Sequence, residues 1–185
     1  MRLVVAITGA SGVIYGIRLL EALQKLKIET HLILTAWGAR TIEIETDETV
    51  DHVRSLATKV YEDGDMAAAI SSGSFRIDGM AIVPCSMKTL ASIANGFDDS
   101  LVSRAAGVCI KEQRKLVLAP RETPLSRIHL ENMEKLAGVG AVILPAMPGF
   151  YHRPKTVDDL VGHVVGKVLD QFGIDHNLFK RWAGG

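Results

Sequence analysis

The chain has few cysteines, no excess of either charge and no long apolar run. Its 185 residues include 2 cysteines, and 21 lysines and arginines balance 21 aspartates and glutamates. A balanced chain has no net field to attract nucleic acid or an anionic membrane, and no apolar run approaches the ~20 residues that span a bilayer. We therefore expect neither of those partners. Cys85 and Cys109 form no close-spaced redox or metal motif and no signal peptide is present, so we expect a cytoplasmic protein.

The sequence also lacks the spacings of the common metal and nucleotide motifs. The six histidines show no H-E-x-x-H or similar ligand spacing, so we expect no metal site. The glycine-rich turn Thr8–Gly12 reads G-x-x-G, without the G-x-G-x-x-G of dinucleotide-binding folds and without the P-loop lysine. Any nucleotide site here departs from those two patterns.

What the sequence does contain begins with residues 2–16, which run from a strand through that turn into a helix. Val4–Ile7 is an unbroken apolar run, typical of a strand covered on both faces of a parallel sheet. The glycines permit a tight turn, and the first N–H groups of the following helix favour an anion. The pattern predicts nucleotide-type phosphate binding at this turn and at the start of the following helix, with a purely structural turn as the alternative.

Strands and helices alternate along the whole sequence. The expected strands cover 2–8, 29–35, 58–61, 79–84, 115–119 and 140–145, and the expected helices cover 12–26, 37–45, 49–56, 87–95, 99–112, 127–137, 156–172 and 175–181. This alternation predicts one α/β domain over 1–185, with a mostly parallel central sheet, helices on both faces and ligands at the carboxyl ends of the strands.

Polar side chains follow five of these strands, and we expect their loops to converge on one crevice. They are Ser11, Thr35, Ser86–Thr89, Arg121–Glu122 and Tyr151. Ser86 is placed to cap a helix whose first N–H groups would hold a ligand, with ordinary capping and a solvated Lys88 as the alternative. We expect the neighbouring Cys85 to be buried and unreactive, because no base lies near it in the sequence.

The densest basic segment carries five cations within residues 104–121. A solvated helix face is the usual meaning of such a run, although Arg104 and Lys111 lie two helical turns apart and so share one face. Arg121 and Glu122 differ, because they close an apolar strand and so belong to the crevice. Arginine suits bidentate phosphate contact, and a carboxylate beside cations suits proton transfer.

Two aromatic residues near the C-terminus need separate interpretation. Tyr151 and Lys155 have the Y-x-x-x-K spacing of short-chain dehydrogenases, but Pro154 between them disfavours the shared helical face that this pair requires. Trp182 is either a packed aromatic or the wall of a site for a cationic group.

Taken together, these segments make the chain resemble the flavin prenyltransferases of the UbiX/Pad type over nearly its whole length. The matching segments are Thr8–Gly12 with Tyr15–Gly16, Glu45–Asp47, Pro84–Thr89, Lys111–Glu112 with Leu116–Leu118, Pro120–Pro124, His129–Met133, Pro148–Tyr151 and Arg181–Trp182. Each segment alone is modest evidence for the resemblance, whereas eight segments in the same order are specific evidence for it.

The resemblance implies a Rossmann-like three-layer flavoprotein with no metal. Such an enzyme joins the dimethylallyl group of dimethylallyl phosphate to N5 and C6 of reduced FMN, and the prenylated FMN serves a UbiD-type decarboxylase. The resemblance also implies a homo-oligomer, commonly a dodecamer. Whether the donor is the monophosphate or the diphosphate stays open.

The resemblance assigns roles to individual residues. The implied FMN contacts are Gly9, Ala10, Ser11, Thr35, Ser86, Met87, Lys88, Thr89 and Arg121. The implied substrate contacts are Arg104, Lys111, Tyr151, Lys167 and Trp182, and the implied catalytic residues are Ser11, Glu45, Lys111 and Glu122. Lys167 stands where relatives often have arginine, which keeps the charge but loses the bidentate fork. Whether Ser11 contacts the flavin or the prenyl phosphate stays open.

Two other functions remain as alternatives. An FMN-dependent decarboxylase of the phosphopantothenoylcysteine or peptidyl-cysteine type shares the fold but uses a histidine in the first helix, which residues 12–27 lack. A non-enzymatic flavin-binding subunit would not need the charges of Arg104, Lys111, Arg121 and Glu122.

Overall fold

The computed structural model describes residues 1–184 and contains a six-stranded sheet in the order β3-β2-β1-β4-β5-β6. Every neighbouring pair of strands runs parallel. The strands are β1 (Arg2–Ile7), β2 (Glu29–Leu34), β3 (Lys59–Glu62), β4 (Gly79–Cys85), β5 (Lys115–Pro120) and β6 (Val142–Ile143). The predicted α/β class with a parallel sheet is confirmed.

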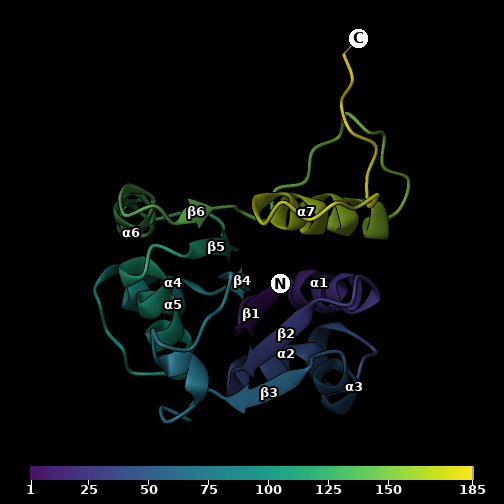
Figure 1. Cartoon of the computed structure of the whole chain (residues 1–185). Helices are drawn as coiled ribbons and strands as arrows, with labels where there is room; N and C mark the ends of the chain where they lie inside the picture. The colour runs from purple at the N-terminus through teal and green to yellow at the C-terminus, as the bar shows by residue number, and fades with distance from the viewer. Residues whose placement is uncertain (185) are drawn as a thin grey trace.

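Helices cover both faces of this sheet (Figure 1). They are α1 (Val13–Lys25), α2 (Ala36–Glu45), α3 (Val50–Ser55), α4 (Met87–Ala94), α5 (Leu101–Lys111), α6 (Arg127–Gly138) and α7 (Val157–Gln171), with a short 3-10 helix at Ala69–Ser71. Six of them are preceded by a serine or threonine N-cap. The side chain of this residue accepts a hydrogen bond from the backbone N–H of the residue three positions later. Such caps satisfy an otherwise unpaired amide, which is why the helices start there.

The core lies in two layers, one on each face of the sheet. Leu3, Val5 and Ile7 pack with α1, α2, α3 and α7, whereas Val4 and Ala6 pack with α4, α5 and α6. This division explains the unbroken apolar run in β1, because both of its faces are buried. Helix α1 lies so close to the sheet at Gly16 that a Cβ there would overlap the carbonyl oxygen of Val83.

The structure differs from the sequence prediction at the C-terminal end. The expected helix over 175–181 is wrong, because residues 174–180 are not helical. Gly173, with φ of 67°, ends α7 and turns the chain back along it. Arg181 and His176 then both bond to Asp170 of α7, at 2.6 and 3.1 Å. These tertiary contacts hold the segment extended. The expected strand over 140–145 is likewise reduced to the two residues of β6.

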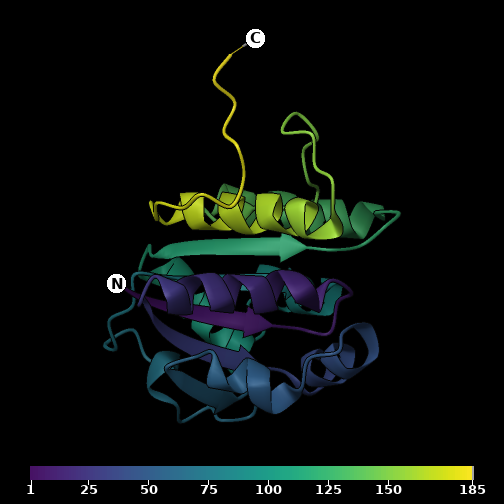
Figure 2. The same cartoon turned by 90° about the vertical axis from the view of Figure 1, so that its right-hand side faces the viewer.

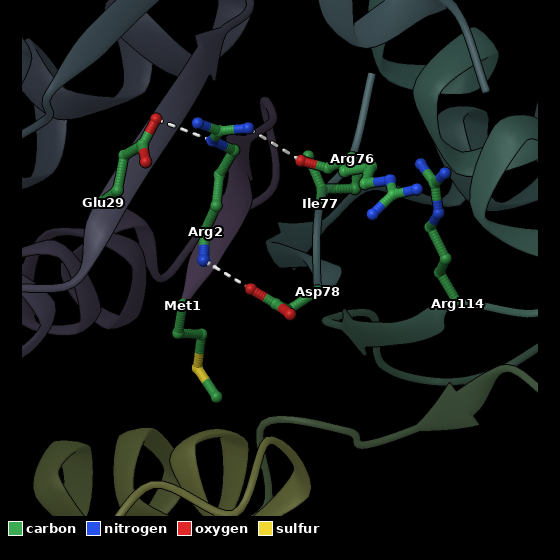
Figure 3. A pocket seen from close by; sticks show the side chains of 7 residues that line it. All are labelled: Met1, Arg2, Glu29, Arg76, Ile77, Asp78 and Arg114. Atoms are coloured by element: carbon green, nitrogen blue, oxygen red, sulfur yellow. Dashed lines mark hydrogen bonds and ion pairs between the residues drawn. The ribbon is translucent and has the colours of Figure 1, made fainter. Parts of the chain in front are cut away.

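The amino edge of the sheet carries a charged cavity of about 540 Å³ (Figure 3). Arg2 donates three hydrogen bonds at the wall of this cavity. Its Nε donates to Glu29 at 2.7 Å, its Nη1 donates to the carbonyl of Arg76 at 3.0 Å, and its backbone N–H donates to Asp78 at 2.6 Å. His31 adds a second bond to Glu29, with Nε2 at 3.0 Å from Oε1. The Arg2 guanidinium, followed by His31, lowers the pKa of Glu29 to about 2. This network ties β1, β2 and the start of β4 together.

We expect Glu29→Gln to weaken the fold in a pH-dependent way. Ionised Glu29 stabilises the folded chain above the ordinary glutamate pKa near 4.3, and that stabilisation is lost as the pH falls toward about 2. The variant should unfold at a lower urea concentration than the parent at pH 7, and the gap should narrow by pH 3. Glu131→Gln is the control, because its partner Arg127 is 91% exposed and exposed pairs contribute little. A gap that stays constant with pH would contradict the role of Glu29.

Candidate active site

A cavity of about 410 Å³ opens at the carboxyl edge of the sheet, where β1, β2 and β4 end. Three helices begin at its wall, because it is lined by Thr35, Ser86 and Ser100, the N-caps of α2, α4 and α5. The remaining lining residues are Thr8, Gly9, Ala36, Trp37, Asp63, Lys88, Thr89, Ser92, Asp99 and Ser103. The first two amides of α5 are already bound, Leu101 to the carbonyl of Asp63 at 2.7 Å and Val102 to its carboxylate at 3.0 Å. Helix N-termini carry partial positive charge, and the starts of α2 and α4 therefore suit an anionic group such as a phosphate.

The start of α4 is held against the end of β1 by the buried side chain of Thr8. Its Oγ1 donates to the carbonyl of Pro84 at 2.8 Å and accepts the N–H of Ser86 at 2.8 Å. Ser86 in turn accepts the N–H of Thr89 at 3.3 Å. The N–H groups of Met87 and Lys88 have no acceptor among residues 1–184. This helix start is therefore fixed in place and still able to bind a ligand.

Gly9 and Trp37 bring the first two loops together at this cavity. A Cβ at Gly9 would overlap the Cβ of Trp37, so only glycine permits the close approach of α2 to the turn. Trp37 is 73% exposed although it lines the cavity, which leaves a flat apolar ring beside the helix caps. Sequence reasoning missed Trp37, although it directly follows the predicted contact Thr35.

Hydroxyl and carboxylate groups form the opposite wall. Asp99 accepts hydrogen bonds from Ser92 at 3.0 Å and Ser103 at 3.3 Å, and lies 3.7 Å from the Lys88 ammonium. The bond from Ser92 is the first cause that lowers the pKa of Asp99. These lining residues were not predicted from the sequence. The N-cap pattern before α5 is a signal that could have found Ser100, whereas nothing local in the sequence points to Asp63, which also lines the cavity.

The first turn lies next to the cavity, but a glutamate of the chain already binds its helix N-terminus. Gly12, with φ of 95°, donates its N–H to Glu45 Oε2 at 2.7 Å, and Val13 donates to the same atom at 3.4 Å. These two amides, which the sequence predicts for a phosphate, therefore bind a carboxylate instead. The caps of α2 and α4 remain as the anion-binding ends.

Arg121 joins the loop after β5 to this turn. Its Nε donates to the carbonyl of Ser11 at 3.2 Å. Ala10 is buried at the turn, whereas Ser11 and Glu122 are exposed. Within residues 1–184, the hydrogen bond that Glu122 accepts is local and comes from the N–H of Thr123 at 3.0 Å. The structure thus places the predicted residues of three loops along one edge.

A second group of predicted residues lies on the outer side of α7. Tyr151 bonds His163 of α7 at 3.2 Å and meets Trp182 edge-on, with ring centroids 6.1 Å apart. Lys167 follows His163 by one helical turn and bonds Asp170 at 3.5 Å. Figure 2 shows the loop before α7 and the C-terminal segment both projecting from the layer of α7, away from the sheet. Tyr151, Lys167 and Trp182 therefore form one cluster.

The predicted cations of α5 do not join that cluster. Arg104 bonds Asp98 at 2.9 Å and Lys111 bonds Glu112 at 2.6 Å. Helix α5 packs on the face of the sheet opposite to α7 (Figure 1). Lys111 also lies at the far end of α5, roughly 16 Å from its N-cap at 1.5 Å per residue. Tyr151 therefore lies with α7 and does not line the cavity that Thr35 and Ser86 line, so the expected convergence of five loops is incomplete within a single chain. Arg104 and Lys111, which the resemblance assigns to the substrate, lie apart from Tyr151.

Three side chains with metal-ligating atoms lie together elsewhere. Glu21, Glu48 and His52 have ligand atoms within 4.8 Å of one another. Glu21 already bonds Arg18 at 2.8 Å, and His52 lies 3.6 Å from Glu48. Ion pairs on the surface account for this group, which is outside the cavity.

No helix among residues 1–184 is both long and apolar enough to cross a membrane.

Comparisons with known proteins agree with this geometry. A sequence model of the Flavoprotein family matches residues 1–169. The chain is 56% identical over 185 residues to a probable UbiX-like flavin prenyltransferase of Streptomyces sp. (strain D7), covering 100% of this chain and 92% of that protein.

Two crystal structures superpose along the whole chain. The dodecameric FMN-dependent UbiX-like decarboxylase of Escherichia coli O157:H7 is 54% identical with a TM-score of 0.98, and 100% of each chain is covered. AnUbiX (PadA1), in complex with FMN and dimethylallyl pyrophosphate, is 53% identical with a TM-score of 0.98, covering 100% of this chain and 98% of that one.

We expect Asp170→Asn to release the C-terminal segment that carries Trp182. The Arg181 guanidinium is the first cause that lowers the pKa of Asp170, so the ionised carboxylate is what holds the segment. Amide hydrogen exchange over residues 174–184 should speed up about tenfold, because a charge-assisted bond is lost. The parent should show the same loosening as the pH falls below the ordinary range of an aspartate. Asp158→Asn is the control, since its carboxylate is 75% exposed at the other end of α7. Equal exchange in both variants would contradict this anchor.

Proposed function

Because the chain belongs to the Flavoprotein family, and within it to the UbiX-like flavin prenyltransferases, we propose that it transfers a dimethylallyl group to N5 and C6 of reduced FMN. The observation that carries the proposal is the cavity of helix N-caps at the carboxyl edge, in a chain that matches AnUbiX (PadA1) over its whole length. The decarboxylase alternative is weaker, because α1 has no histidine.

The residues predicted to contact FMN form a continuous strip along the carboxyl edge. Thr35, Ser86, Lys88 and Thr89 line the cavity, and Gly9 joins it to the turn. Arg121 bonds Ser11 at the other end of the strip. We assign the phosphate of FMN to the caps of α2 and α4, since their amides remain free. The hydroxyl-rich wall suits the ribityl chain.

The substrate phosphate needs residues from more than one copy of the chain. The cluster on α7 and the cations on α5 lie on opposite faces of one sheet, so a single phosphate cannot touch both sets within one chain. We propose a homo-oligomer, a dodecamer like the one described for the Escherichia coli protein, in which Arg104 and Lys111 of one copy face Tyr151 and Lys167 of another.

Exposed apolar side chains support this assembly. Phe150 and Met147 are each 69% exposed, Trp182 is 67% exposed and Val157 is 74% exposed. Met147 and Phe150 belong to the loop before α7 and Trp182 to the C-terminal segment, and both of these segments project from the layer of α7 in Figure 2, whereas Val157 is the first residue of α7. Large exposed apolar side chains on projecting segments are typical of surfaces that pack against another subunit.

The chemistry needs these charges. When the allylic C–O bond breaks, negative charge gathers on the departing phosphate and positive charge on the prenyl carbon. Fixed cations and the Tyr151 hydroxyl stabilise the first without a metal ion, and the ring of Trp182 favours the second. Lys167 supplies a point charge in place of an arginine fork.

In ring closure the double bond of the N5-linked prenyl group takes up a proton, its tertiary carbon bonds to C6, and C6 then releases its own proton. Glu122 is the carboxylate beside Arg121 on the loop after β5, so we propose it as the acceptor, with the released phosphate as the alternative. Ser11 and Glu45 flank the same edge at the first turn. Service to a UbiD-type decarboxylase and a cytoplasmic location also remain part of the proposal.

The test is anaerobic incubation of the purified chain with reduced FMN and dimethylallyl phosphate, or dimethylallyl pyrophosphate in a parallel sample. Mass spectrometry of the extracted flavin should show a gain of one C5 unit with at least one donor. An unchanged flavin with both donors would overturn the proposed function.

We expect Glu122→Gln to separate the two bond-forming steps. The glutamine keeps the size of the side chain but cannot accept the C6 proton, so ring closure should slow by about 100-fold, a typical contribution of a general base. The extracted flavin should gain the C5 mass while its absorption spectrum lacks that of the four-ring product. FMN affinity should not change.

Glu134→Gln, on the exposed surface of α6, is the matched control and should behave as the parent. Normal formation of the four-ring product by Glu122→Gln would contradict the assignment of Glu122 as the base.

A further inference from the structure

His163 binds the loop that carries Tyr151 at two points. It is a buried residue of α7, only 7% exposed. Its Nδ1 accepts the backbone N–H of Gly149 at 3.2 Å, and its Nε2 lies 3.2 Å from the hydroxyl of Tyr151. One imidazole therefore fixes both the backbone of this loop and its phenol.

The ring of His163 is itself held by its neighbours. His152 stacks on it, with centroids 5.1 Å apart and planes 3° from parallel, and Phe179 packs against it at 4.8 Å. Gly149 is needed for this packing, since a Cβ there would come within 3.1 Å of the Tyr151 ring and 3.3 Å of His163 Nε2. The imidazole has little freedom to rotate away from the loop.

These two bonds determine which nitrogen of His163 carries the proton. Nδ1 accepts an amide N–H, so the proton of the neutral ring sits on Nε2. The Nε2–H group then donates to the oxygen of Tyr151, and that oxygen keeps its own hydrogen free to donate elsewhere. A donor at this position suits an anionic oxygen.

We infer that His163 is a positioning residue, which holds Tyr151 so that the phenol O–H donates to the phosphate of the prenyl donor. The inference rests on the proposed function, in which Tyr151 contacts that phosphate. Nothing local in the sequence signals His163, because a buried histidine on an apolar helix face has no motif of its own.

The surroundings keep His163 neutral, as this role requires. Burial is the first cause that lowers its pKa, followed by His152 and Lys167, whereas Asp170 acts in the opposite direction. The C-terminal segment adds Arg181 and His176, both bonded to Asp170. On the other side of α7, helix α1 contributes Arg18, which pairs with Asp158. Protonation of Nδ1 at acid pH would break the bond from Gly149.

The experiment is a double-mutant cycle between His163→Phe and Tyr151→Phe. The phenylalanine at 163 keeps a ring for stacking and removes both hydrogen bonds. We expect each single variant to lose about tenfold in kcat/KM for dimethylallyl phosphate, as loss of a bond to a charged group would give. The double variant should lose no more than either single one, because His163 acts through Tyr151. FMN affinity and assembly should match the parent.

Two further readouts exclude a merely structural role. His163→Gln, whose amide N–H₂ replaces the Nε2–H donor, should recover part of the loss. In the parent, protonation of His163 should lower kcat/KM as the pH falls. This decrease should be absent in Tyr151→Phe, because His163 acts through Tyr151. Additive losses in the double variant, or the same decrease in Tyr151→Phe, would overturn the inference.

A binding measurement separates this inference from the proposed function. With inorganic phosphate as the probe, both single variants should bind more weakly than the parent by the same factor. Nitrogen-15 NMR of His163 should show an unprotonated Nδ1. If the parent does not prenylate FMN, these two results still test the placement of Tyr151. A protonated Nδ1 at neutral pH would overturn it.

Discussion

The parallel direction of all six strands is the constraint on which the site depends. Parallel strands end at one edge of the sheet, and the helices that follow them begin there. The N-caps Thr35, Ser86 and Ser100 consequently line one cavity, although they are far apart in the sequence. Free amides and helix dipoles at the starts of α2 and α4 favour an anion there, in addition to the Lys88 ammonium. Most of the proposed FMN site is therefore backbone geometry, held in place by Thr8 and by Gly9, which permits the close approach of α2.

The same constraint separates the residues that would handle the substrate. A helix that begins at the carboxyl edge must return to the amino edge, so α5 carries Lys111 away from the cavity. Helices α5 and α7 also cover opposite faces, which keeps Lys111 and Arg104 apart from Tyr151 and Lys167. A small α/β chain thus has the charges for metal-free phosphate departure, but it cannot gather them alone. The proposed assembly of several copies would bring these charges together, and the exposed aromatic segments around α7 are suited to it.

Local sequence signals predicted the elements that depend on local chemistry. The sequence predicted three such features: the buried run of β1, the serine and threonine caps, and the glycine turn. Burial, capping and turn formation could be predicted because they depend on neighbouring residues. Contacts between residues far apart in the sequence could not be predicted in this way. Glu45 reaches the amides of Gly12 and Val13 across more than 30 positions, so the turn looked free for a phosphate. Asp170 likewise binds Arg181 across 11 positions, and the segment between them is extended where the local sequence favours a helix.

In the proposed assembly, one active site combines Lys111 of one copy with Lys167 of another. The most direct test is to mix Lys111→Ala and Lys167→Ala chains, each inactive alone, under conditions that exchange subunits, and to measure FMN prenylation. Random assembly should restore about a quarter of the parent activity, because some interfaces then receive both intact lysines from different chains. If the mixture stays as inactive as either variant, the two lysines do not combine between copies, and the claim is contradicted.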